Sequence, residues 1–313
     1  MLAALTNWDV RIDRSLSRTD RSNSENLIWQ DGNGPLAISQ ICMSESTYYR
    51  LRMGCELYVD VHASRLIVAN TSPTVSKTTL DHFLADQVLP RAMAHEGDFV
   101  LHAGAVRLGN AAILLMGTSG RGKSTLATSF DQAGLPLLGD DAMVISWHDD
   151  RPQAKAVYPS LRLLPDSIEA LFPTAIKTTS VADYTQKRRV DVSRIDADRA
   201  SLLPIKAIFS IAGPGDDLRI TLRRLSIAEA CMACVESSFA LDPADLDRAR
   251  GRLDDASALA GQIPAFEISY PRDFARLPEV RQAILDQLDP LDASGPISCN
   301  VASLPPPTPR PAR

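Results

Sequence analysis

A glycine-rich stretch, GTSGRGKS, places the strongest constraint on how this chain can fold. It fits the pattern GxxxxGK[ST] with Gly117, Gly122, Lys123 and Ser124. The apolar run AAILLMG precedes it, and KSTLATSFDQAG follows it with the character of a helix that ends at Gly134. A glycine-rich loop between a buried strand and a helix is typical of proteins that hold phosphate groups, so we predict an α/β fold.

The residue types of this loop explain how it would hold a phosphate chain. Glycines allow backbone conformations that turn successive N–H groups toward phosphate oxygens, and the start of the helix adds its positive end. Lys123 can reach the β- and γ-phosphates, and the Ser124 hydroxyl can bind Mg²⁺. The sequence therefore predicts a nucleotide site formed by Gly117, Ser119, Gly120, Arg121, Gly122, Lys123, Ser124 and Thr125.

Two adjacent aspartates, Asp140 and Asp141, follow the apolar run LPLL and precede AMVISW. This places them at a strand end in a sheet that we expect to be of the parallel type, at the edge where ligands gather. An isolated pair of aspartates is usually a polar turn, but this pair lies only a short helix beyond the loop. One carboxylate beside Mg²⁺ and one that accepts a proton would complete a phosphoryl-transfer site. Their mutual repulsion would raise the proton affinity of one of them.

A histidine, His102, precedes the loop in the run FVLHAGAV. The turn pair Gly109-Asn110 predicts a hairpin between this run and AAILLMG. Such a hairpin would bring His102 beside the phosphate loop. From the residues alone, a buried core histidine and a site histidine remain equally good interpretations.

Composition argues against several other classes of protein. A net charge of −5 and a pI near 5.6 argue against a nucleic-acid partner. The apolar runs are too short for a membrane span, and the N-terminus does not resemble a secretory signal, so we expect a cytoplasmic protein. Five scattered cysteines favour reduced thiols, and the CxxC of Cys231 and Cys234 falls in a run with helical spacing, where we expect buried helix residues.

The chain divides by its pattern into three parts. Residues 1–95 predict a β-rich module with short strands and a linking helix that Pro90 interrupts or ends. Residues 96–290 contain the loop and predict the catalytic domain. Residues 291–313 are rich in proline and predict a disordered tail.

The order of LHAGAV, hairpin, GTSGRGKS and GDDAMVI resembles the catalytic domain of HPr kinase/phosphorylase, a bacterial serine kinase family related to PEP carboxykinase. The positions that match the family in type and spacing are His102, Lys123, Ser124, Asp140 and Asp141. The resemblance implies a P-loop-containing HPr kinase/PEP carboxykinase-like core with ATP and Mg²⁺. It also implies that Asp140 takes the proton from an acceptor serine, that Asp141 and Ser124 serve the metal or the phosphate, and that His102 lines the phosphate site.

The chain departs from the family at two loop positions. Thr118 and Thr125 stand where an acidic residue and a glutamate are usual, and no ERG-like run follows Asp141. With its β-rich N-terminal module, the chain is more similar to HPr kinase-like proteins associated with ribosomally made peptides. Some of these are lasso-peptide precursor kinases.

We therefore predict a serine kinase whose partner is a peptide or small protein with an acceptor serine, and which is a possible homo-oligomer. The alternatives are an HPr-directed regulatory serine kinase/phosphorylase, a kinase of a small-molecule hydroxyl, and a non-catalytic nucleotide-sensing module. The run KRRVDV, with Lys187, Arg188 and Arg189, is either an exposed basic turn or a source of positive charge for the phosphoryl group.

Overall fold

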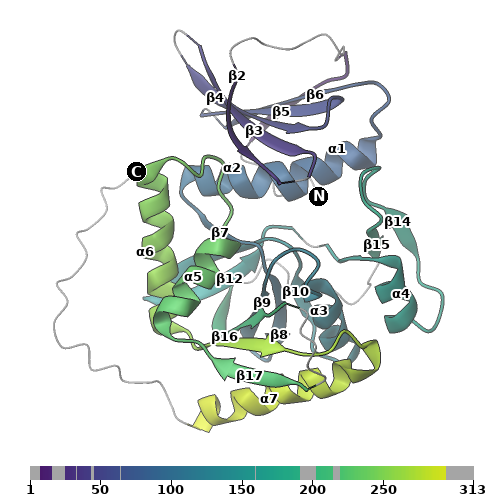
Figure 1. Cartoon of the computed structure of the whole chain (residues 1–313), viewed down its shortest axis with the longest axis vertical. Helices are drawn as coiled ribbons and strands as arrows, with labels where there is room; N and C mark the ends of the chain where they lie inside the picture. Colours follow the sequence, from purple (N-terminus) through teal and green to yellow (C-terminus); the bar gives the residue numbers. More distant parts are fainter. Residues whose placement is uncertain are drawn as a thin grey trace, which may run out of the picture.

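The computed structural model describes residues 8–15, 25–32, 34–43, 46–63, 65–158, 160–190, 202–213 and 219–293. The chain has a mixed α/β fold with a six-stranded, a nine-stranded and a three-stranded sheet. In Figure 1 the six-stranded sheet lies at one end of the molecule, and a long helical segment separates it from the larger sheet.

The six-stranded sheet has the strand order β1-β6-β5-β4-β3-β2, in which only β1 and β6 are parallel. The strands are β1 (Asp9–Asp13), β2 (Glu25–Gln30), β3 (Leu36–Cys42), β4 (Thr47–Met53), β5 (Leu57–His62) and β6 (Leu66–Thr71). Five of them, β2 to β6, confirm strands predicted from the sequence. Whether residues 1–95 form an independent domain stays a prediction.

The helical segment below this sheet consists of α1 (Lys77–Phe83), the π-helical turn η2 (Leu84–Val88) and α2 (Leu89–Glu96). Its apolar residues Leu80, Phe83 and Val88 are buried in one core with the inner face of the sheet, as the helical spacing predicts. Pro90 does not end the helix, because it lies in the first turn of α2, where a missing N–H costs little. The π-helical turn before Pro90 absorbs the change in hydrogen bonding.

The nine-stranded sheet carries the phosphate loop. Its main path has the order β10-β8-β9-β16-β12-β11-β7, and β18 and β17 extend it from β16. The strands are β7 (Phe99–Leu101), β8 (Gly104–Leu108), β9 (Ala111–Met116), β10 (Leu137–Gly139), β11 (Met143–His148), β12 (Arg151–Ala156), β16 (Leu203–Ile211), β17 (Thr221–Arg224) and β18 (Ala265–Ser269).

Helices cover both faces of this sheet (Figure 1). On one face α5 (Ile227–Ser237) and α6 (Leu246–Gln262) share a core with the strands. On the other face α3 (Lys123–Gln132), α4 (Pro165–Leu171) and α7 (Leu277–Ala293) form a second core. The sequence predicts α3, α5 and α7, whereas α4 and α6 were not predicted.

Two sequence expectations about this sheet need correction. The predicted hairpin joins β8 and β9 through Gly109-Asn110, but the run before it breaks after Leu101, so His102 lies between β7 and β8 rather than in the hairpin. The strands on either side of the two aspartates are antiparallel to their neighbours, and among the described strands of this sheet only β9, β16 and β18 pair in parallel. β10 pairs with β8, and β11 pairs with β12 and β7, in each case antiparallel, so the strands that flank the two aspartates do not belong to the parallel part of the sheet.

A small sheet, β13 (Arg162–Leu163), β15 (Arg188–Val190) and β14 (Thr178–Ser180), lies beside α4 (Figure 1). The helix α7 continues through residue 293 and so includes the first three residues of the predicted tail, while residues 294–313 lie outside the described residues, as does Cys299. Among the helices that the structure describes, none combines the length and the apolarity needed to cross a membrane.

Candidate functional site

The phosphate loop connects the end of β9 to the start of α3, as the motif requires. Gly117, Gly120 and Gly122 have φ angles of 135°, 79° and 91°, which L-residues with side chains rarely adopt. A β-carbon at Gly117 would lie 2.9 Å from the carbonyl oxygen of Ile211 on the neighbouring strand β16. These glycines are therefore required by the backbone path of the loop.

The loop lysine is held inside the loop. Lys123 is buried, and its Nζ donates hydrogen bonds to the carbonyl oxygens of Gly117 (2.7 Å) and Thr118 (3.3 Å). Burial lowers the pKa of Lys123, although Asp141 and Asp140 oppose this effect. A phosphate chain in the loop would replace these carbonyl contacts with stronger charge-assisted ones.

Ser124 and Asp140 form a direct pair at the start of α3. The Ser124 hydroxyl donates a 2.9 Å hydrogen bond to Oδ1 of Asp140, a residue with an exposed fraction of 0%. Burial and repulsion from Asp141 raise the pKa of Asp140 to about 7. A hydroxyl and a carboxylate beside a phosphate loop fit Mg²⁺, which takes one or two carboxylates together with substrate phosphates rather than a cage of protein ligands.

Asp141 has a different environment from its neighbour. Its backbone is left-handed, with a φ of 71°, so the turn directs the two aspartates differently. Its carboxylate pairs with the Arg162 guanidinium, and Oδ1 lies 3.6 Å from Nε2 of His102. Burial raises the pKa of Asp141, but attraction to Arg162 and the His102 hydrogen bond outweigh burial, so the pKa lies well below its ordinary value.

Arg162 is a site residue that the sequence prediction missed. It is buried in β13, and besides Asp141 it contacts Oδ1 of Asp86 (2.5 Å), the Tyr158 hydroxyl (2.8 Å) and Nδ1 of His82 (2.7 Å). Asp86 lies in the π-helical turn η2. The network therefore connects the helical segment under the six-stranded sheet directly to the aspartate pair.

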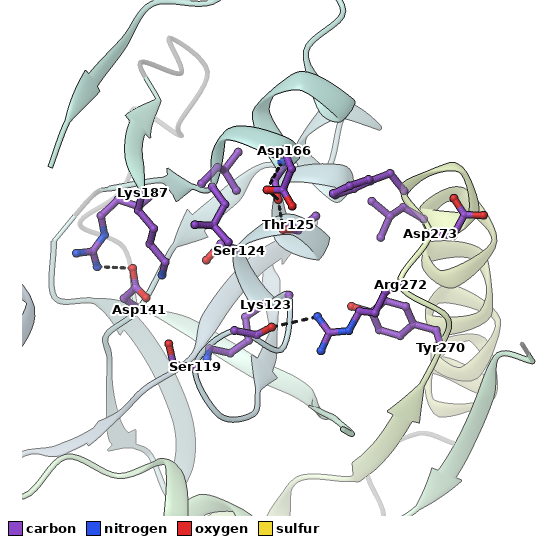
Figure 2. Close-up of a pocket in the computed structure, with 18 of the residues that line it drawn as sticks. Ser119, Lys123, Ser124, Thr125, Asp141, Asp166, Lys187, Tyr270, Arg272 and Asp273 are labelled. Carbon is purple, nitrogen blue, oxygen red and sulfur yellow. Dashed lines mark hydrogen bonds and ion pairs between the residues drawn. The ribbon is translucent and has the colours of Figure 1, made fainter. Parts of the chain in front are cut away.

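An open cavity of about 270 Å³ lies over the loop, near the ~300 Å³ lower limit of small-molecule sites (Figure 2). Most of the predicted site residues line it: His102, Ser119, Gly120, Gly122, Lys123, Ser124, Thr125 and Asp141. Three predicted residues do not: Gly117, Arg121 and Asp140. Gly117 shapes the loop from below, and Arg121 donates a 2.9 Å hydrogen bond to the Thr118 hydroxyl.

The two aspartates differ in their access to the cavity, while their predicted roles stay predictions. Asp140, expected to take the acceptor proton, is fully buried against Ser124. Asp141, expected to serve the metal with Ser124, instead faces the cavity beside His102. The sequence could not separate them because their order in the chain does not reveal which way a left-handed turn points each carboxylate.

The basic run divides in a similar way. Lys187 lines the cavity and lies on the same side of Ser124 as Asp141 in Figure 2. Arg188 is exposed and donates a 2.8 Å hydrogen bond to the Thr178 hydroxyl. Each interpretation of the run thus holds for one residue: Lys187 lines the cavity, and the side chain of Arg188 is exposed.

Segments distant in sequence complete the cavity. Tyr270, Arg272, Asp273 and Phe274 come from the stretch between β18 and α7, and Leu277 begins α7. Leu163 ends β13, and Leu164, Asp166 and Ser167 come from the start of α4. Sequence reasoning identified none of these residues, because neither stretch has a motif of its own.

The other candidate ligands do not form a metal centre. Within the described ranges, no group of three or more His, Cys, Asp or Glu side chains could hold a metal ion. Cys231 and Cys234 lie in α5, and Cys234 is fully buried, which confirms the helix prediction. Burial raises the pKa of the Cys234 thiol to about 12, so it stays protonated.

No protein-family model matches this chain, and no curated protein matches it. A solved structure that is similar to it is the Hpr(Ser) kinase/phosphatase from Coxiella burnetii, with 16% sequence identity and a TM-score of 0.33. The similarity covers 63% of this chain and 99% of that chain. At this identity and score the similarity assigns no activity and no residue role.

Proposed function

We propose that this protein is a kinase that transfers the γ-phosphoryl group of ATP, with Mg²⁺, to a serine hydroxyl of a peptide or small protein. One observation carries the proposal: the glycine-rich loop, Ser124, His102 and Asp141 line one cavity, and Asp140 holds Ser124 by a hydrogen bond. A site that only binds a nucleotide has no need of a second carboxylate that faces the phosphate end of the cavity.

Each residue has a separate role in the proposed transfer. The loop N–H groups and Lys123 hold the phosphate chain and balance its charge. The Ser124 hydroxyl and the Asp140 carboxylate would hold Mg²⁺, which supplies positive charge to the β- and γ-phosphates. His102 and Lys187 line the end of the cavity where negative charge develops.

We assign the proton acceptor role to Asp141. The acceptor serine oxygen forms a bond to the γ-phosphorus, the bond between that phosphorus and the ADP oxygen breaks, and the serine proton passes to the carboxylate. Asp140 has the higher pKa, but of the two buried aspartates only Asp141 lines the cavity, and a general base must first reach the proton. A strong base is not required, because the transition state of phosphoryl transfer is largely dissociative.

Positive charge at the mouth of the site supports a peptide acceptor. Lys187 lines the cavity and lies on the same side of Ser124 as Asp141 in Figure 2, where an acceptor must approach the γ-phosphate. Arg188, the next residue, has an exposed side chain. The resemblance to peptide-associated HPr kinase-like proteins rests on the β-rich N-terminal module and the LHAGAV run. Together with that resemblance, the charge supports a ribosomally made precursor peptide, such as a lasso-peptide precursor, as the acceptor.

The test is transfer of labelled phosphate from γ-labelled ATP to an array of serine peptides, with and without Mg²⁺. We expect labelled phosphoserine with the wild-type protein. We expect Asp141→Asn to lower the rate by at least a hundredfold with little change in ATP affinity, since general base catalysis typically contributes ~10²–10⁴-fold. Asp140→Asn should instead weaken the Mg²⁺ dependence.

Two results would contradict the proposal in different ways. Tight ATP binding without transfer to any serine peptide, or to purified HPr, would favour the nucleotide-sensing module. Labelling of HPr alone would support phosphoryl transfer but would identify HPr, rather than a peptide, as the acceptor. An Asp141→Asn variant with the wild-type rate would disprove the assigned base but not the kinase activity.

A further inference from the structure

The cavity has two chemically different ends on either side of the phosphate loop. In Figure 2 Asp141 and Lys187 lie on one side of Ser124, whereas Tyr270, Arg272 and Asp273 lie on the other. The first end is built from charged side chains. The second is mixed, because Tyr270, Phe274 and Leu277 add aromatic and apolar surface beside the charged Arg272 and Asp273.

The direction of the phosphate chain follows from the loop. The lysine of such a loop reaches the β- and γ-phosphates, and the serine lies at the metal between them, so the terminal phosphate points toward Asp141. The α-phosphate, and whatever is attached to it, must therefore leave toward the opposite end. That end is the one formed by the start of α4 and the stretch from Tyr270 to Leu277.

This second end of the cavity directly adjoins the loop. The Tyr270 hydroxyl and Nη1 of Arg272 would each lie 3.3 Å from a β-carbon on Gly122, and Arg272 donates a 3.1 Å hydrogen bond to the Gly120 carbonyl. On the other side the Thr125 hydroxyl lies 3.1 Å from that of Ser167 in α4. The stretch that contains Tyr270 and Arg272 and the start of α4 therefore both contact the loop directly.

Two walls of this end present large apolar side chains to solvent. Leu164, which caps the start of α4, is 41% exposed, and Phe274, at the start of the 3₁₀ turn η3 (Phe274–Arg276), is 37% exposed. Apolar side chains of this size are normally buried, and here both line the same cavity. Carboxylates accompany each of them, Asp166 beside Leu164 and Asp273 beside Phe274.

We propose that this end is the nucleoside subsite, which takes a purine base between Leu164 and Phe274, with the ribose toward Asp166 or Asp273. This rests on the proposed function, because it assumes that the loop holds a nucleoside triphosphate. Flat bases stack on aromatic and apolar side chains, and carboxylates accept hydrogen bonds from ribose hydroxyls. An apolar side chain of the peptide acceptor is the competing occupant.

The test compares the affinities of ATP and of inorganic tripolyphosphate for the same variants of the full chain, measured by titration calorimetry. We expect Phe274→Ala and Leu164→Ala each to raise the Kd of ATP by about tenfold, the usual loss when a stacking side chain is removed. The Kd of tripolyphosphate should not change. Leu253→Ala, which truncates a side chain 48% exposed on α6, is the matched control and should change neither value.

Every other pattern overturns the nucleoside subsite. An unchanged Kd of ATP in both variants would show that the base does not bind at this end. An equal rise in the Kd of ATP and of tripolyphosphate would show that the variants damage the loop itself. Weakened peptide binding with unchanged ATP affinity would assign the end to the acceptor. The kinase proposal fails separately if the variants change the Kd of ATP as expected but the wild-type chain transfers no phosphate.

Discussion

Replacement of Arg162 by methionine tests the buried network that connects the site to the rest of the chain. The side chain is 2% exposed and contacts the carboxylates of Asp86 and Asp141, the Tyr158 hydroxyl and a His82 ring nitrogen. Methionine fills similar space but has no charge and no donors. The buried carboxylate of Asp141 and the partly buried one of Asp86 would then lack their shared cation.

The structure allows an estimate of the cost. Breaking a buried ion pair by removal of one partner costs about 3–5 kcal/mol, because the other charge stays buried without compensation. Here one cation serves two carboxylates, so we expect Arg162→Met to lower the free energy of unfolding by an amount in the upper part of that range at neutral pH. The loss is large for a fold whose total stability is on the order of 10 kcal/mol.

The cost should depend on pH in a defined direction. In the wild-type protein attraction to Arg162 keeps the pKa of Asp86 and Asp141 below ordinary values, against the opposing effect of burial, so these carboxylates add stability that is present at neutral pH and lost in acid. Without Arg162, burial would instead raise both pKa values. Protonation would then neutralise these carboxylates in the variant. The difference in the free energy of unfolding between the two proteins should therefore shrink as the pH falls toward 4.

Urea unfolding of both proteins at several pH values provides the measurement. Arg223→Met is the matched control, because Arg223 also pairs with two carboxylates, Glu229 and Glu267, but is 53% exposed. It should change stability little. A loss for Arg162→Met below about 1 kcal/mol, or one that does not vary with pH, would refute the view that Arg162 holds two unscreened charges.

Two further outcomes are expected. Burial lowers the pKa of His82 to about 4, so unfolded chains take up a proton between pH 6.5 and 4 that folded chains do not; the wild-type protein should lose on the order of 3 kcal/mol over this range relative to His82→Asn. Parallel stability curves for the two proteins would contradict this. Gly117→Ala should weaken ATP binding at least tenfold in titration, because its β-carbon meets a backbone oxygen of β16. Gly109 also has a positive φ, of 59°, but a β-carbon there would meet nothing within 4 Å, so Gly109→Ala should bind ATP as the wild type does.

Local patterns explain why part of this architecture could be predicted from the sequence. The loop, the helix that follows it and the two aspartates are adjacent in the chain, so their chemistry and spacing can be read together. The strands β2 to β6 and the helices α3, α5 and α7 follow from apolar periodicity and from turn residues.

The remaining features depend on contacts between distant parts of the chain. Arg162 meets Asp86 across 76 positions, and Arg272 meets the loop at Gly120 across 152 positions. Neither residue belongs to a motif. The different surroundings of Asp140 and Asp141 depend on one left-handed backbone angle at Asp141, and aspartate is among the few residues that adopt this angle without a recognisable sequence pattern.

The π-helical turn η2 also affects the angle between the six-stranded and the nine-stranded sheet. It adds one residue to the turn of an otherwise continuous helix, and each residue of an α-helix corresponds to a rotation of about 100°. Deletion of a single residue there would let the helix close into a regular one. The six-stranded sheet would then have to rotate by that angle about the helix axis, or Asp86 would leave Arg162. The length of this short turn therefore affects which face of α1 meets the N-terminal sheet while Asp86 meets Arg162.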